Sequence, residues 1–314
     1  MSFAIQPGER PAQAIARAAA RDIDQCQQAL ARIADDTEKN VHGVRKRIKR
    51  LRALLRLARF SIATDDYKKA NSALRDASRL LATARETAVR KRGLELMLRA
   101  LPQENEAFTR TLRQVIVGPA PVATPGASSS VPDDETVQRA RQHFATAAAV
   151  FATLGDVHGK WSVVRPGFRR SYALGRQFMR QSLQDTSTHA FHEWRKWVKY
   201  QWHQVELLTP VWPEELGLRC TVLKRLADVL GDEHDLADLR EHLLSASIPL
   251  EFAGDLEQLL AALDVRRAEL RRDALRIGTR LFAEKPAAFE GRVARYYRAY
   301  AGEDHNAVSL PDDR

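Results

Sequence analysis

Two short runs of histidine and basic residues hold the side chains most suited to chemistry in this sequence. The first run, which we call the first basic ridge, consists of His42, Arg45, Lys46 and Lys49. The second basic ridge has the same spacing and consists of His192, Arg195, Lys196 and Lys199. Arginine binds phosphate oxygens in bidentate geometry, lysine binds them as a point charge, and histidine donates hydrogen bonds and gains charge beside phosphate. The ridges therefore predict a site for a phosphate-rich anion.

A helix places each ridge on one side and apolar residues on the other. At about 100° per residue, the first ridge and Arg56 share one arc of the helix. The opposite face holds Val44, Ile48, Leu51 and Leu55. In the second copy Trp194 lies on the packing face, so we expect it in the core. Residues 41–59 contain eight lysines and arginines and no carboxylate, so nothing in this segment neutralises the first ridge.

The two ridges belong to an internal repeat of about 150 residues. The second histidine stands 150 positions after the first, and the segments downstream align with an offset of 149. Arg75 then corresponds to Lys224, and Arg85-Glu86 to His234-Asp235. Duplication in register is not expected of a random charged surface, so we interpret the ridges as functional.

Other expected helices carry basic strips of the same kind. If these helices pack through their apolar faces, the strips converge on a shared groove or cavity. The further candidate binding residues are Arg17, Arg21, Arg56, Arg75, Arg79, Arg169, Arg176, Arg180 and Lys224.

Composition and periodicity predict an all-α protein. Of the 314 residues, 44% are apolar and 29% are charged, which excludes wholesale disorder. β-branched residues are sparse and show no sustained alternation, and the formal net charge of +10 calls for an anionic partner. We expect helices over 9–34, 40–61, 66–89, 90–100, 103–116, 135–154, 165–185, 189–209, 214–231, 234–247, 250–283 and 286–300.

Cysteine usage and the absence of long apolar runs indicate a cytoplasmic protein without a membrane segment. Cys26 and Cys220 are too few for a secreted disulfide framework, and we expect both to be small buried apolar residues. The first residues show no leader sequence, and no apolar run approaches the roughly 20 residues of a membrane span.

The repeated motif resembles the CHAD family, the conserved histidine α-helical domain. His-x-x-Arg-Lys-x-x-Lys opens a basic amphipathic helix twice, and each copy is followed by a Leu/Val-Leu-x-x-x-basic-acidic stretch. The resemblance covers residues 8–302 and implies two pseudo-symmetric helical bundles around a basic central cavity. The offset divides this single domain into units 8–157 and 158–302. A Pro/Gly/Ser-rich loop, 118–134, interrupts the first unit, and 303–314 form a polar tail.

The resemblance also implies a function. It implies binding of inorganic polyphosphate, often at polyphosphate granules, without catalysis and without a cofactor, and both basic ridges would line the cavity. Trp197, Tyr200 and Trp202 stand where the family usually has further basic residues, and His234 replaces an arginine. The second unit is therefore less basic than the first. Since few residues precede the region, we expect a stand-alone binding protein.

Two alternatives remain open. A basic groove also attracts nucleic acid, and tryptophans provide surfaces on which bases stack. An all-α metal-dependent phosphohydrolase of the HD type would combine His234-Asp235 with His203 and Asp264. The wider set with metal-ligand spacing is His189, His192, His234, Asp235, Asp238, Glu241 and His242. Because arginine replaces His234 in the first copy, an ion pair between helices is the simpler interpretation, and we expect neither metal nor enzymatic activity.

Overall fold

A computed structural model describes residues 3–81, 90, 93–95, 97–98, 105–117 and 132–302. Throughout these residues the only regular structure is helical, which confirms the all-α prediction. None of the helices in these ranges is both long and apolar enough to cross a membrane.

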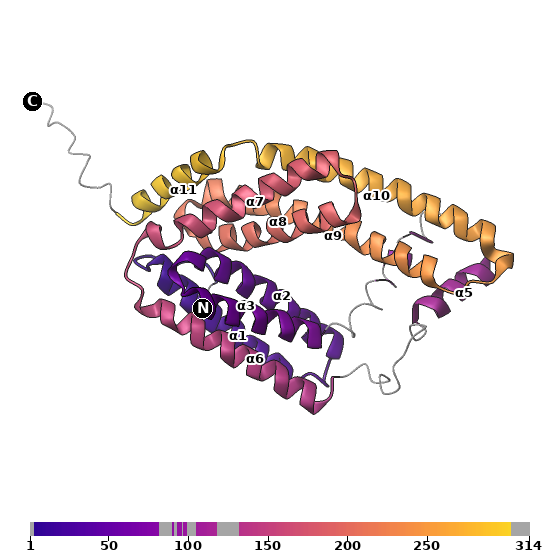
Figure 1. Ribbon diagram of the computed structural model, residues 1–314, viewed down its shortest axis with the longest axis horizontal. Helices are drawn as coiled ribbons and strands as arrows, with labels where there is room; N and C mark the ends of the chain where they lie inside the picture. The colour runs from indigo at the N-terminus through magenta and orange to yellow at the C-terminus, as the bar shows by residue number, and fades with distance from the viewer. Residues whose placement is uncertain are drawn as a thin grey trace, which may run out of the picture.

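The first bundle consists of four helices of the N-terminal half. They are α1 (Pro11–Ala31), α2 (Thr37–Leu57), α3 (Thr64–Leu80) and α6 (Asp134–Ala152). α1 and α3 pack on α2, and α6 closes the bundle against α1 and α3 (Figure 1). The alanine-rich buried face of α1 allows this close packing, since small side chains let helix backbones approach one another.

The second bundle contains the C-terminal helices. They are α7 (Arg165–Gln184), α8 (Thr188–Leu208), α9 (Pro213–Ser245), α10 (Ala253–Leu281) and α11 (Pro286–Tyr300). α8 packs between α7 and α9, and α10 packs along α9. The two helices that carry the basic ridges, α2 and α8, also contact each other and join the bundles.

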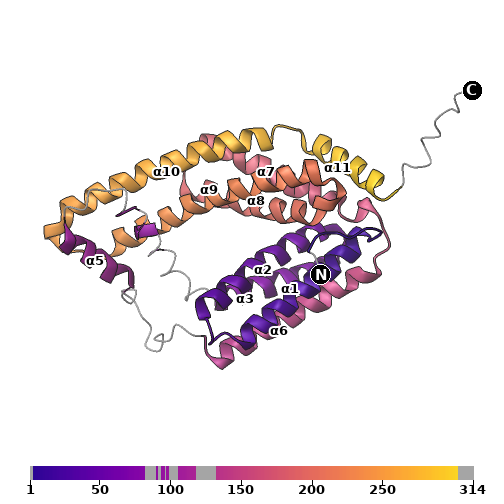
Figure 2. The same ribbon diagram turned by 180° about the vertical axis from the view of Figure 1, so that it is seen from behind.

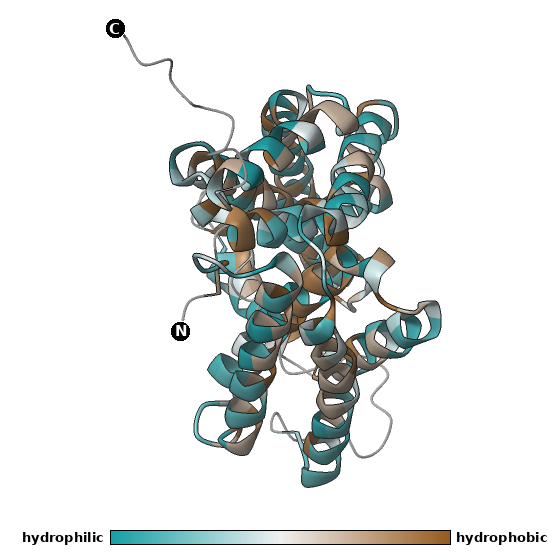
Figure 3. Cartoon of the chain, turned by 90° about the vertical axis from the view of Figure 1, so that its left-hand side faces the viewer, coloured by the Kyte–Doolittle hydropathy of each residue, from teal (hydrophilic) through white to brown (hydrophobic). Residues whose placement is uncertain are grey.

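From this contact the two bundles diverge toward the end of the molecule at which α5 (Glu106–Val117) lies, as Figures 1 and 2 show from opposite sides. Hydrophobic residues gather where the bundles meet, and hydrophilic residues cover the outer turns (Figure 3). The helices of each predicted unit pair in a similar order, α1 with α2 and α7 with α8. The internal repeat and the central cavity stay predictions.

Part of the predicted first unit packs with the second. Leu94, Leu98, Leu112 and Ile116 share a buried apolar cluster with Leu239 of α9 and with residues of α10. The first unit is therefore not a separate packing unit, because its middle section buries its apolar side chains at the far end of the second bundle.

The largest error in the expected helices concerns α9. The ranges 214–231 and 234–247 form one helix, Pro213–Ser245, because Asp232 and Glu233 continue it without a break. A short 3-10 helix, Leu250–Phe252, precedes α10 where one helix over 250–283 was expected. Most of 82–104, loop residues 118–131 and the tail 303–314 lie outside the described residues.

Candidate anion-binding site

The first basic ridge lies on the N-terminal half of α2. The Asp36 side chain accepts a hydrogen bond from the Lys39 backbone N–H and caps the helix just before the ridge. His42 and Lys46 are exposed, whereas Arg45 is half-buried. This arrangement presents a histidine and an ammonium group to solvent from a helix whose opposite side is in the core.

Arg45 connects the ridge to the neighbouring helix. Its Nη1 donates to the carbonyl oxygens of Ser78 at 2.8 Å and Leu81 at 3.3 Å. These carbonyls stand at the end of α3, where backbone acceptors lack partners within the helix. Arg45 therefore holds α3 against α2 in addition to adding charge to the ridge.

The second basic ridge is less exposed and partly neutralised. All four of its residues are half-buried. Lys196 Nζ lies 2.7 Å from Oε1 and 2.9 Å from Oε2 of Glu193, which occupies the position of Gly43 in the first copy. The second ridge therefore presents less net positive charge than the first.

His192 packs against His234, the counterpart of the expected arginine. The two ring centroids are 4.7 Å apart. Burial, and then the charge of Arg195, lower the pKa of both histidines, that of His234 to about 4. Because desolvation disfavours the charged form, both rings are neutral at neutral pH in the free protein.

The contact between α2 and α8 lies beyond both ridges. Gln204 Nε2 donates to the Ala53 carbonyl at 3.1 Å, and the Arg56 guanidinium lies 4.1 Å from the centroid of the Tyr200 ring. Both ridges precede these contacts on their helices. They therefore lie on the halves of α2 and α8 that extend toward the side on which the bundles diverge (Figures 1 and 2). Their convergence on a single cavity stays a prediction.

Several other predicted binding residues form contacts within the protein. Arg17 Nε and Nη2 donate to Glu9 at 2.7 and 2.8 Å, and Nη2 also donates to the Ala4 carbonyl. Arg75 and Arg79 both pair with Asp76. Lys224 pairs with Asp228 at 2.9 Å on the surface. Exposed pairs of this kind are weak, so only Arg17 is firmly held.

The predicted arginines of α7 and α1 lie at further places. Arg176 Nε donates to the Phe282 carbonyl at 2.9 Å. Arg176 and Arg180 line a hollow of about 270 Å³ that also includes Pro286. Arg169 is exposed elsewhere on α7, and Arg21 is half-buried on α1. No residue of either ridge lines this hollow.

A second hollow, of about 300 Å³, lies between the bundles. It is lined by Arg56, Arg59, Phe60, Tyr67, Gly167, Arg170, Ser171 and Trp197. The sequence identified Arg56 but not Arg59 or Arg170. Arg52, Arg56 and Arg59 follow the spacing i, i+4 and i+7, which places them on one helical face and could have indicated this surface. We call it the arginine hollow.

The Arg52 guanidinium one turn before Arg56 lies in a strongly cationic environment. Burial lowers the pKa of Arg52. The nearby charges of Arg56 and Arg75 lower it further, whereas Tyr200 and Tyr67 raise it. The Arg52 Nε is buried without a hydrogen-bond partner in the described part of the chain. An anion bound nearby would relieve this repulsion.

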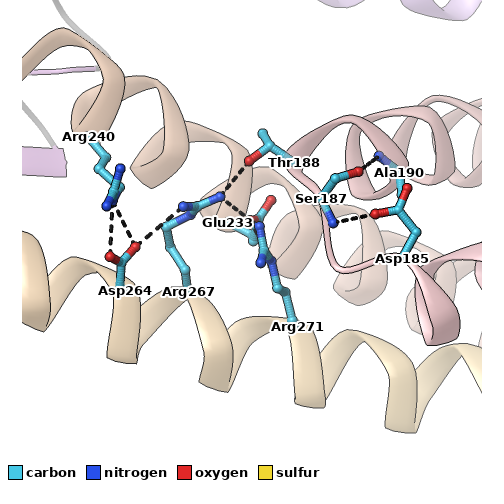
Figure 4. A network of polar contacts seen from close by, with 9 residues as sticks. All are labelled: Asp185, Ser187, Thr188, Ala190, Glu233, Arg240, Asp264, Arg267 and Arg271. Atoms are coloured by element: carbon cyan, nitrogen blue, oxygen red, sulfur yellow. Dashed lines mark hydrogen bonds and ion pairs between the residues drawn. The ribbon is translucent and has the colours of Figure 1, made fainter. Parts of the chain in front are cut away.

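A buried charged network fixes the start of α8 (Figure 4). Glu233 of α9 is only 1% exposed, and its Oε1 accepts from Arg267 at 3.0 Å and from Arg271 at 2.7 Å. Arg267 also donates to the Thr188 hydroxyl at 2.7 Å, in the first turn of α8. Sequence reasoning missed this network because its members come from three helices far apart in the chain.

The residues proposed for a metal-dependent hydrolase have other partners. His203 Nδ1 lies 2.9 Å from Glu206 Oε2, and Asp264 pairs with Arg240 and Arg267. Within the described ranges no group of three or more His, Cys, Asp or Glu is placed to hold a metal ion. Arg85-Glu86, the counterpart of His234-Asp235, lies outside those ranges.

Comparison with known protein families finds a match to the CHAD domain over residues 14–244. The matched segment begins in α1, ends in α9 and contains both basic ridges. No curated protein and no solved structure matches the chain.

Proposed function

Because the chain belongs to the CHAD domain family, we propose that it binds inorganic polyphosphate, chiefly through the first basic ridge. One observation carries this proposal: the exposed His42 and Lys46 lie on α2 within a segment, 41–59, that contains no carboxylate. The second ridge acts as a weaker contact, because Glu193 neutralises Lys196. The protein would act as a non-catalytic binder in the cytoplasm, at polyphosphate granules.

The geometry of a helix suits a linear polyanion. With a rise of about 1.5 Å per residue, the four residues of the first ridge extend over roughly 10 Å of α2. They would contact successive phosphates of one chain, and each contact would release condensed counterions. Affinity should therefore depend on salt and on polymer length.

Titration with polyphosphates of defined length across a salt series tests this function. We expect affinity to rise with chain length, because a longer polymer meets more cations. The logarithm of affinity should fall linearly with the logarithm of salt concentration, with a slope that counts the phosphates neutralised. Binding that is insensitive to salt and to length would overturn the proposal.

Paired variants test the role of the first ridge. We expect Lys46→Ala/Lys49→Ala to weaken polyphosphate binding about tenfold or more, since losing about 1.4 kcal/mol of binding free energy corresponds to a factor of ten. Arg45 is left intact because it holds α3. Lys196→Ala/Lys199→Ala in the second ridge is the matched variant and should cost less. Unchanged affinity in the first variant, at unchanged helicity, would contradict the assignment.

Nucleic acid is the competing polyanion for the same ridges. At physiological salt we expect polyphosphate to displace single-stranded RNA from the protein, and the reverse result would favour nucleic-acid binding. Incubation of polyphosphate with the protein and added Mg²⁺ or Mn²⁺ tests the non-catalytic role. Release of inorganic phosphate above a protein-free control would overturn it.

A further inference from the structure

The arginine hollow is lined by guanidinium groups together with the rings of phenylalanine, tyrosine and tryptophan. The basic ridges contain none of these three residue types. We propose that it binds a mononucleotide, with the base against Trp197 and Phe60 and the phosphate on Arg56, Arg59 and Arg170. This site differs in chemistry and position from the ridges, and it does not depend on polyphosphate binding.

The guanidinium groups of the hollow are available to an anion. None of the residues that line it is acidic, and in the part of the chain that the structure describes Arg56, Arg59 and Arg170 form no ion pair. Arg52, one turn earlier on α2, adds a further cation whose pKa is lowered by burial. A phosphate would satisfy these groups by charge-assisted hydrogen bonds.

Aromatic rings hold two of the arginines in place. The Arg56 guanidinium lies 4.1 Å from the Tyr200 ring centroid, and that of Arg59 lies 4.4 Å from the Tyr67 centroid. A stacked guanidinium keeps its N–H groups at its edge, where they can reach a phosphate. Each of these two arginines has one hydrogen bond within the protein, to the Arg52 carbonyl and the Thr64 hydroxyl respectively. Since arginine has five N–H donors, others remain for a ligand.

Two further rings line the hollow, and each has a guanidinium over one face: Arg56 lies 5.9 Å from the Trp197 ring centroid, and Arg59 lies 5.9 Å from that of Phe60. The proposed base would stack on the opposite face. Trp197 lines the hollow with its indole held edge-to-face against Tyr200, at a centroid distance of 5.4 Å. Phe60 lines the same hollow and is 55% exposed. Stacking of a base on an aromatic side chain contributes about 1–3 kcal/mol to binding.

In the predicted internal repeat, two aromatic residues of α8 replace basic residues of α2. With the offset of 150, Trp197 and Tyr200 of α8 occupy the positions of Arg47 and Arg50 on α2. A polyphosphate has no ring system and gains nothing from aromatic faces in place of cations. The exchange therefore favours a phosphate ligand that carries an aromatic ring.

The size and closure of the hollow favour one nucleotide over a strand. A volume of about 300 Å³ is at the lower end of small-molecule sites. α7 lies directly on the end of α2, since a Cβ on Gly167 would come within 2.1 Å of the Leu57 carbonyl oxygen. Ser171, also in the lining, is buried and accepts from Gln204 Nε2 at 3.0 Å. The two helices thus close one side of the hollow.

Calorimetry with adenosine monophosphate and ribose 5-phosphate tests the proposal, because the two ligands share sugar and phosphate and differ in the base. We expect AMP to bind at least tenfold more tightly. Trp197→Leu should remove most of this difference, and Arg170→Gln should weaken both ligands. The matched control is Trp212→Leu, since Trp212 is a partly exposed tryptophan packed on Tyr296. Equal binding of AMP and ribose 5-phosphate, or a difference that survives Trp197→Leu, would overturn the proposal.

The same variants separate this site from polyphosphate binding. Trp197→Leu and Arg170→Gln should retain polyphosphate affinity, whereas Lys46→Ala/Lys49→Ala should retain AMP affinity. Because Arg170 is exposed, its variant keeps the test valid if Trp197→Leu does not fold. A ten-nucleotide RNA that binds far more tightly than AMP, with the gain lost in Trp197→Leu, would show that the ligand is a strand and overturn the mononucleotide assignment.

Discussion

α2 and α8 carry the same four-residue motif in different surroundings. On α2 the residue after the histidine is Gly43, and His42 is exposed. On α8 it is Glu193, which pairs with Lys196, and His192 is half-buried against His234. The second copy therefore has an acidic residue within its own motif, and the first does not. A motif repeated in register need not repeat its function.

The arginine of the motif is a packing residue in both copies. Arg45 donates to the carbonyls at the end of α3. The Arg195 guanidinium lies beside Gly231 of α9, 3.8 Å from the position that a Cβ on this glycine would take. In each bundle the arginine thus contacts the helix that follows in the chain, and the difference between the copies lies mainly in the lysines and histidines.

The largest expected effect concerns how each motif helix is anchored. The start of α8 depends on the buried Glu233, so we expect Glu233→Ala to lower the free energy of unfolding by about 3–5 kcal/mol, because it removes the buried carboxylate that pairs with Arg267 and Arg271. Urea denaturation measures this loss. The matched change at the start of α2, Asp36→Ala, removes an exposed N-cap and should cost about 1 kcal/mol. Similar losses of stability in the two variants would contradict the expected difference between the anchoring of α8 and that of α2.

A smaller effect is expected from exchanging the residue that follows each histidine. Gly43→Glu adds a carboxylate three residues before Lys46 and should weaken polyphosphate binding several-fold. The helix should accept it, since a Cβ at Gly43 meets only the flexible end of Arg47. Glu193→Gln releases Lys196 and should strengthen binding two- to threefold. Titration at fixed salt measures both changes, and a shift of the same sign in both variants would be inconsistent with charge neutralisation as the cause.

The smallest effect concerns the response of the second copy to acid. The pKa of His234 is about 4 in the folded protein against 6.5 for an unperturbed histidine. Between these values the unfolded chain binds the extra proton, so stability is retained above pH 6.5 and decreases as the pH falls toward 4. At pH 6, protonation of this histidine in the unfolded chain lowers the free energy of unfolding by about 1 kcal/mol. His234→Asn should reduce the loss of stability between pH 7 and pH 6 in urea denaturation. An equal reduction in the matched His42→Asn variant would remove the distinction between the copies.

Sequence patterning was sufficient for the fold class and for much of the core. Helical periodicity placed Trp194 and Cys26 inside, and both are fully buried. Cys220 is only half-buried, so its prediction was partly wrong. The two basic runs were also placed correctly on amphipathic helices, because charge and hydrophobicity alternate with the helical period.

Features that depend on packing between distant segments were not predictable. The arginine hollow brings together Arg59 and Arg170, which single-helix patterns cannot relate. Glu233 falls in the gap between the expected helices 214–231 and 234–247, and its ion pairs with Arg267 and Arg271 of α10 cannot be predicted from helical periodicity. Periodicity gives the face of a helix but not the helix that will cover it.

The docking of α5 onto the far end of the second bundle has a consequence for synthesis on the ribosome. Leu112 and Ile116 reach their packing partner Leu243 only after the intervening stretch has been translated. At about 5–20 residues per second this takes on the order of ten seconds. During that time the nascent chain exposes apolar side chains that the completed N-terminal helices do not cover, so chaperone demand should be concentrated on this segment.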